Sequence, residues 1–179
     1  MAFDIFPQFH FDQYTMRPLK IDDALAYYEY MTHDAVSQFI NRSNRVHSIN
    51  KAEEEINYWR KLFYNRQGIY WGIALNDTLI GTAGYNMLLL QDRKGEISYD
   101  LKYEYWGRGI MSNALKLIMA HSCSVFNLVR IQATTITTNT RSIKLLEKLG
   151  FIREGTLKNF ETVDGINMLA SYMYAKIYS

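Results

Sequence analysis

The 179-residue chain contains a single cysteine, Cys123, and no apolar run approaching the roughly 18 residues needed to cross a membrane. One cysteine excludes an intramolecular disulfide and argues against a cysteine-ligated zinc site. The first residues show no basic segment followed by a continuous apolar one, so no secretory signal peptide is apparent. We therefore expect a soluble protein of the reducing cytoplasm.

An excess of charge of one sign is also missing, because 20 basic residues nearly balance 18 acidic ones and the net charge is +2. Nucleic-acid-binding proteins usually concentrate basic residues in a stripe, and none is found here, so we expect no nucleic-acid partner. The four histidines are scattered without paired spacing, which leaves a metal site unsupported. What the chain does contain is 48% hydrophobic and 15% aromatic residues, enough to bury the core of a folded domain.

No internal repeat, low-complexity tract or linker rich in Pro, Gly and Ser divides the sequence, so residues 1–179 are predicted to form one domain. The alternation and helical spacing of apolar residues predict its elements. In chain order these are a short edge strand over 13–17, helices over 19–32 and 50–64, strands over 70–75, 79–85 and 95–101, a helix with Met111, Leu115, Ile118 and Met119 on its apolar face, a strand over 130–136, a helix that ends at Gly150, and strands near 152–160 and 168–177.

Polar residues mark the ends of several elements. Asn50, with Glu53 three places later, is predicted to cap the helix over 50–64. Asn139 is predicted to cap the helix that ends at Gly150. Hairpin turns are predicted at 76–78 and 163–165. Residues 95–136 run strand, loop, helix, strand, which predicts a right-handed crossover between parallel strands. The predicted fold class is α/β, a mixed sheet with helices on both faces.

The loop that enters the helix after residue 109 places an arginine between two glycines, Gly107-Arg108-Gly109. A helix start presents unpaired N–H groups and the positive end of a dipole, and glycines let an oxyanion approach the backbone, so the loop is a candidate phosphate site. The alternative, that the glycines only close a turn, stays open on this loop alone. Ile110-Met111-Ser112 lacks the Lys-Ser/Thr of a Walker A loop, and residues 122–146 lack the acidic residue of a dinucleotide-binding fingerprint.

Longer motifs make a resemblance specific. EISYDL, then WGRGIM four residues later, then RIQA and NTRSIKLLEKLGFIREG, resemble the GNAT superfamily of acetyl-CoA-dependent N-acetyltransferases. The resemblance covers most of the chain, from TMRPLKIDDA onward, and is nearest to the Rim-type branch that acetylates the N-termini of ribosomal proteins. It implies a mostly antiparallel twisted sheet in which one parallel strand pair splays apart.

By this resemblance the loop holds the pyrophosphate of coenzyme A on its backbone N–H groups, while the end of the strand over 95–101 pairs with pantetheine and Asn139 meets the thiol arm. The bulky Met111 departs from the small residue usual in the family. The residues expected to bind acetyl-CoA are Leu101, Tyr103, Trp106, Gly107, Arg108, Gly109, Ile110, Met111, Ser112 and Asn139.

Acetyl transfer from a thioester to an amine requires a neutral amine, stabilisation of the carbonyl oxygen and a proton for the thiolate. Direct attack in a ternary complex meets these needs without Cys123 as a nucleophile. Many family members protonate the thiolate with a tyrosine, but Leu146 stands at that position, and the Rim-type pattern offers Ser142 instead. Glu161 and Glu96 are the candidate bases by the same pattern. The alternatives are a helix-capping Ser142 and solvated or ion-paired glutamates.

The acceptor is expected to be a protein N-terminus or a small amine. Residues 33–50 are expected to border its groove and carry one acidic residue, Asp34, which disfavours polycations. Tyr27, Tyr28 and Tyr30 either line that groove or serve as core packing. A CoA-binding sensor without turnover is the alternative function, and a homodimer is left open by the edge strands.

Overall fold

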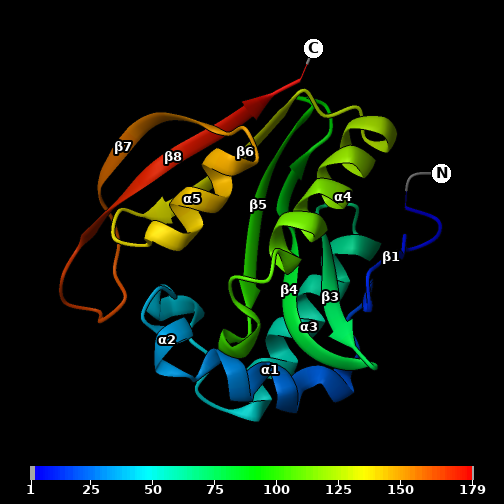
Figure 1. Cartoon of the computed structure of the whole chain (residues 1–179), viewed down its shortest axis with the longest axis horizontal. Helices are drawn as coiled ribbons and strands as arrows, with labels where there is room; N and C mark the ends of the chain where they lie inside the picture. The colour runs from blue at the N-terminus through cyan, green and yellow to red at the C-terminus, as the bar shows by residue number, and fades with distance from the viewer. Residues whose placement is uncertain (1–2, 179) are drawn as a thin grey trace.

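The computed structural model describes residues 3–178, apart from the side chain of Arg42 (Figure 1). Its centre is a mixed sheet in the order β1-β2-β3-β4-β5-β6-β8-β7. The β5–β6 pair is parallel and the other pairs are antiparallel, as the resemblance implies. The strands are β1 Phe9–Phe11, β2 Tyr14–Pro18, β3 Ile69–Leu75, β4 Thr78–Leu89, β5 Lys94–Leu101, β6 Arg130–Ile136, β7 Ile152–Glu161 and β8 Leu169–Ile177.

Helices cover both faces of the sheet, as predicted. In Figure 1, α4 lies in front of β3 to β5 and α3 behind them. Neighbouring side chains of β3 confirm the two layers, because Trp71 joins the core under α4 whereas Tyr70 joins the core under α1 and α3. The helices are α1 Ala24–Met31, α2 Asp34–Ser37, α3 Ile49–Tyr64, α4 Ile110–Val125 and α5 Thr140–Lys148, with 3₁₀ turns at Ile21–Asp23, Arg42–Asn44 and Tyr103–Tyr105.

The edge strand was predicted in the wrong place. β2 lies inside the sheet, because β1 pairs with it and takes the edge. Pro18 is tolerated as the last residue of β2, where a missing N–H costs little. Phe9 anchors β1, since its ring lies 5.8 Å from that of Trp71 and 5.5 Å from that of His121. β1 has only three residues, which is too short for a clear alternation of apolar and polar side chains, so the sequence contained no signal for it.

Two local end signals were also wrong. The cap of α3 is Ser48, whose hydroxyl accepts a hydrogen bond from the Lys51 N–H at 3.1 Å, so Asn50 lies inside the helix. The last hairpin has a longer loop than an Asp-Gly turn, because β7 ends at 161 and β8 begins at 169. Asp164 organises that loop by accepting the N–H groups of Ile166 and Asn167, each at 2.8 Å.

Other end signals are confirmed. Asn76 and Asp77 both have positive φ in the β3–β4 turn, and Gly150 has φ +82° just after α5. The Asn139 side chain accepts the Ser142 N–H at 3.2 Å and caps α5. The four residues predicted for the apolar face of α4 are all buried.

The parallel pair separates as expected. Hydrogen-bonded pairing of β5 and β6 covers only 94–96 against 130–132, although β5 continues to Leu101 and β6 to Ile136. Beyond these pairs the two strands diverge. The divergence interrupts the sheet and opens the space in which the candidate site lies.

Candidate functional site

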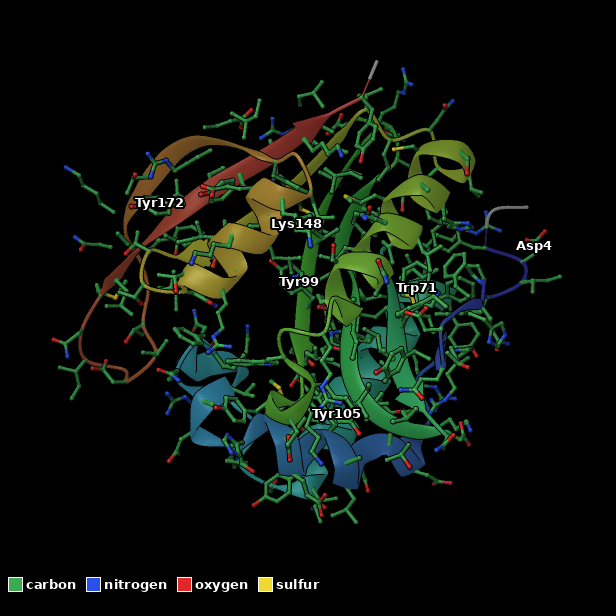
Figure 2. All side chains as sticks on the ribbon, viewed as in Figure 1. Asp4, Trp71, Tyr99, Tyr105, Lys148 and Tyr172 are labelled. Atoms are coloured by element: carbon green, nitrogen blue, oxygen red, sulfur yellow. The ribbon has the colours of Figure 1, made fainter. Side chains whose placement is uncertain are left out.

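A cavity of about 970 Å³ occupies the divergence of β5 and β6. Side chains from α1, α3, β3, β5, β6, α5 and the end of β7 line it, together with the glycine loop and the first turn of α4. Tyr99, Tyr105 and Lys148 are among the lining residues, and Figure 2 shows Tyr99 on β5 in the gap between α4 and α5. The cavity is large enough for an extended ligand that meets groups on both sides of the sheet.

The glycine loop has the geometry of an anion site. Gly107 and Gly109 have φ of +76° and +78°, and a Cβ built on either would meet no atom within 4 Å. Gly109 is the N-cap of α4, so the first N–H groups of a 16-residue helix point toward the cavity mouth without helical partners. In the first turn, the Ser112 hydroxyl is buried and has no hydrogen-bond partner among the described residues. An oxyanion would satisfy these donors, so the loop fits a diphosphate.

Positive charge gathers on the same side of the cavity. Lys144 and Lys148 of α5 line it, as does Arg141, whose guanidinium lies 4.8 Å from the centre of the Trp106 ring. Trp106 is itself fixed, because its indole N–H donates to the Leu101 carbonyl at 2.7 Å. These three cations complement the phosphates of a nucleotide-like ligand.

Two of the ten residues expected to bind acetyl-CoA lie outside the cavity lining. The Arg108 guanidinium lies 5.2 Å from the centre of the Tyr105 ring, and Tyr103 stacks on His33 with ring centres 5.1 Å apart. The remaining eight are brought together around the cavity: Leu101, Trp106, Gly107, Gly109, Ile110, Met111, Ser112 and Asn139.

Ser142 faces the cavity with a partner that the sequence did not reveal. Its hydroxyl is within 2.8 Å of the Tyr99 hydroxyl and is hydrogen bonded to it. Burial raises the pKa of Tyr99 to about 12, and the hydrogen bond with Ser142 opposes this shift. Tyr99 therefore stays protonated at neutral pH and holds the Ser142 hydroxyl beside β5. The two residues are 43 positions apart in the chain, so no local pattern joins them.

The two predicted carboxylates also line the cavity, and each has an oxygen that is already hydrogen bonded. Glu96 Oε2 accepts from the Gln132 side-chain amide at 2.9 Å. Glu161 Oε1 accepts from the hydroxyl of Ser171 on the neighbouring strand β8. Both residues line the same cavity as Ser142 and Asn139.

Sequence reasoning missed two further carboxylates in the cavity, Asp100 on β5 and Glu55 on α3. Asp100 accepts the Tyr30 hydroxyl at 2.5 Å and the Thr82 hydroxyl at 2.6 Å, while burial raises the pKa of Asp100 to about 6. Burial and the charge of Asp100 raise the pKa of Glu55 to about 7, against the opposing effects of Lys51 and of a hydrogen bond with the Tyr27 side chain.

A sequence signal for Glu55 existed. Glu55 lies three residues after Ala52 and four before Trp59, and both of these residues are buried. Residues at this spacing share one face of a helix, so Glu55 belongs to the inward face of α3 and not to a solvated acidic run. Burial of Asp100 had no such local signal.

The described residues include no group of three His, Cys, Asp or Glu that could hold a metal ion. Within the same residues, no helix combines the length and the apolar character that crossing a membrane requires.

Comparison with known proteins gives consistent matches. A family model described as acetyltransferase (GNAT) domain matches residues 13–152. The chain is 32% identical over 163 residues to the uncharacterized N-acetyltransferase YoaA of Bacillus subtilis (strain 168), covering 90% of this chain and 92% of that protein.

Solved structures extend the match to the whole fold. The ribosomal-protein-S5-alanine acetyltransferase from Vibrio fischeri has a TM-score of 0.84 and 26% identity, with 96% of each chain covered. A RimL ribosomal L7/L12 α-N-protein acetyltransferase, solved in complex with coenzyme A, has a TM-score of 0.85 at 20% identity, covering 93% of this chain and 95% of that one.

Proposed function

This chain belongs to the acetyltransferase (GNAT) family, and we propose that within this family it transfers an acetyl group from acetyl-CoA to a primary amine by direct attack in a ternary complex. One observation carries the proposal. The parallel strands β5 and β6 diverge and open a cavity, and α4 starts at that cavity. Two glycines with positive φ precede α4, and the Ser112 hydroxyl in its first turn is buried without a hydrogen-bond partner among the described residues.

The loop from Trp106 to Ser112 would hold the diphosphate, with Arg141, Lys144 and Lys148 beside it. Asn139 and Leu101 would flank the thiol arm as it passes between β5 and β6. Of the two residues outside the lining, Arg108 would contribute long-range charge at the loop and Tyr103 would support Trp106, whose ring lies 5.2 Å away.

For the chemistry, Ser142 would donate a proton toward the departing thiolate, with Tyr99 fixing its hydroxyl. Glu96 and Glu161 are the two family-derived candidates for receiving the proton of the amine, and both line the cavity. Acetyl-CoA supplies the activated acyl group, and the protein supplies position and proton transfer.

The acceptor would be a protein N-terminus or a small amine, the former supported by the name of the Vibrio fischeri neighbour. Residues 1–179 would form one domain around the single described sheet, active in the cytoplasm, where the free thiol of Cys123 stays reduced. The exposed edge strand β7 would supply the contact if a homodimer forms.

Calorimetric titration of acetyl-CoA tests the proposal. We expect low-micromolar binding, roughly 7–8 kcal/mol. Gly109→Val should weaken it at least tenfold, since valine disfavours the left-handed backbone at φ +78°. Gly155→Val is the matched control, because Gly155 lies on β7 with open space around it and without a positive φ.

Release of CoA should then follow when an amine or peptide is added. Absence of binding in the unaltered protein would refute the proposal. Binding without turnover over a broad amine panel would instead support a CoA sensor, the alternative that Leu146 in place of a tyrosine keeps open.

A further inference from the structure

The cavity has two chemically different ends. Side chains alternate along β5, so Tyr99 points to Ser142 on α5 whereas Asp100 points to Tyr30 on α1. The α5 side carries the glycine loop and three cations, as described above. The opposite side, which we name the acceptor chamber, is lined by Tyr27, Glu55, Trp59, Tyr70 and Asp100. An anionic cosubstrate at one end and carboxylates at the other indicate a cationic second substrate.

The lining carboxylates differ in how far their hydrogen bonding is satisfied. Asp100 accepts three hydrogen bonds, from the Tyr30 hydroxyl and from the hydroxyl and N–H of Thr82. Glu96 and Glu161 each hold a polar side chain of a neighbouring strand. Glu55 is hydrogen bonded to the Tyr27 side chain, but its Oε2 is buried and has no hydrogen-bond partner among the described residues.

An unsatisfied buried carboxylate oxygen is costly, and a donor that enters the chamber would relieve the cost. The last torsion of a glutamate is broad and roughly two-fold, so rotation about it can exchange the two carboxylate oxygens.

We propose that Glu55 binds the ammonium group of the acceptor in this chamber and takes its proton, which makes Glu55, in place of Glu96 or Glu161, the base of the reaction. The inference rests on the function proposed above and adds the residue and the substrate class. Apolar side chains of the α1–α2 region also line the cavity, namely Met31, Val36, Phe39 and Ile40, beside the amides of Asn41 and Asn44. The acceptor is therefore a compact primary ammonium attached to apolar carbon.

The ammonium gives one proton to the Glu55 carboxylate and becomes a neutral amine, whose nitrogen attacks the thioester carbon. A C–N bond forms and the C–S bond breaks. The Ser142 hydroxyl gives its proton to the thiolate and is restored by the second proton that the nitrogen loses. Glu55 then returns its proton to solvent.

The surroundings of Glu55 suit a base at neutral pH. Asp100 faces it from β5, Tyr27 from α1 and Tyr70 from β3, and Lys51 belongs to its own helix. Burial and the Asp100 charge raise the pKa of Glu55 to about 7, so the ionised form is available at pH 8 and its basicity is close to that of the most effective general bases.

Kinetics of three variants test the proposal at saturating acetyl-CoA, with benzylamine and an alanine-initiated hexapeptide as acceptors. Glu55→Gln should lower kcat/KM for the better acceptor about 100-fold or more. It should leave the Kd of acetyl-CoA within twofold and remove the acid limb near pH 7 from the pH profile. Glu54→Gln is the matched control, since Glu54 is the preceding residue with a side chain 70% exposed.

Glu55→Asp keeps the carboxylate and should retain the acid limb and part of the rate. Equal loss in the Gln and Asp variants would indicate packing and overturn the proposal, as would unchanged kcat/KM in Glu55→Gln. A loss of acetyl-CoA binding by the unaltered protein would refute the proposed function instead.

One readout needs no turnover. In NMR spectra of protein labelled with carboxyl-¹³C glutamate, the Glu55 resonance is identified as the one that disappears in Glu55→Gln. Benzylammonium at pH 8 should shift this resonance and leave that of Glu54 in place. No shift at saturating benzylammonium would also overturn the proposal.

Discussion

Replacing Glu55 with glutamine should stabilise the protein at pH 8 and change its stability far less at pH 5. The physical cause is the burial of Glu55 beside Asp100, which raises its pKa from an ordinary value of 4.5 to about 7. The folded state therefore binds more protons than the unfolded state between these values. Stability declines as pH rises through this window and stays low above it. Glutamine does not titrate, so the variant escapes this decline.

The magnitude follows from the same shift. At about 1.36 kcal/mol per pKa unit, the ionised Glu55 lowers the free energy of unfolding by up to about 3 kcal/mol at pH 8. At pH 5 the corresponding difference is under about 1 kcal/mol, because most of the window lies above that pH. For a chain of this size, roughly 2–4 °C in Tm accompany each kcal/mol, so the variant should melt up to about 6–12 °C higher at pH 8.

Urea unfolding followed by tryptophan fluorescence at pH 5 and pH 8 measures both differences. Glu54→Gln controls for charge removal at an exposed position of the same helix. The assignment of Glu55 as a carboxylate destabilised by burial would be refuted by either of two results. One is that Glu55→Gln is no more stable than the unaltered protein at pH 8, and the other is that it gains the same free energy of unfolding at both pH values.

Two further changes test the site and the core. Tyr99→Phe removes the hydrogen-bond partner of the Ser142 hydroxyl, so kcat should fall several-fold with the Kd of acetyl-CoA unchanged. The double variant Tyr99→Phe, Ser142→Ala should lose little more activity than Ser142→Ala alone. Additive losses in steady-state assays would contradict a shared role. Leu146→Ala should lower the free energy of unfolding by about 2–5 kcal/mol, because Leu146 is fully buried and its loss leaves a cavity; a loss below about 1 kcal/mol by urea unfolding would contradict its place in the core.

Much of the fold could be predicted from the sequence because the signals are local. β6 has the predicted bounds, and α4 buries the predicted face, since apolar spacing and backbone preference act within a few residues. The glycine loop was located in the same way, because only glycine adopts positive φ without penalty at 107 and 109. The order of elements predicted the mixed sheet and its parallel pair, whereas the mostly antiparallel pairing and the splay of that pair came from motifs that resemble a family.

What the sequence by itself determined is therefore the set of elements, their order, and the loop that fits a diphosphate. The tertiary structure decided which strand lies at the edge, which residue caps α3, and which carboxylates enter the cavity. Glu55 and Asp100 acquire raised pKa values only when α3 packs on the sheet and burial excludes water from both carboxylates. Ser142 contacts Tyr99 only because the fold places α5 beside β5, where β5 and β6 separate. Hydrogen-bond partners and desolvation depend on residues distant in the chain, and no local pattern of side chains encodes them.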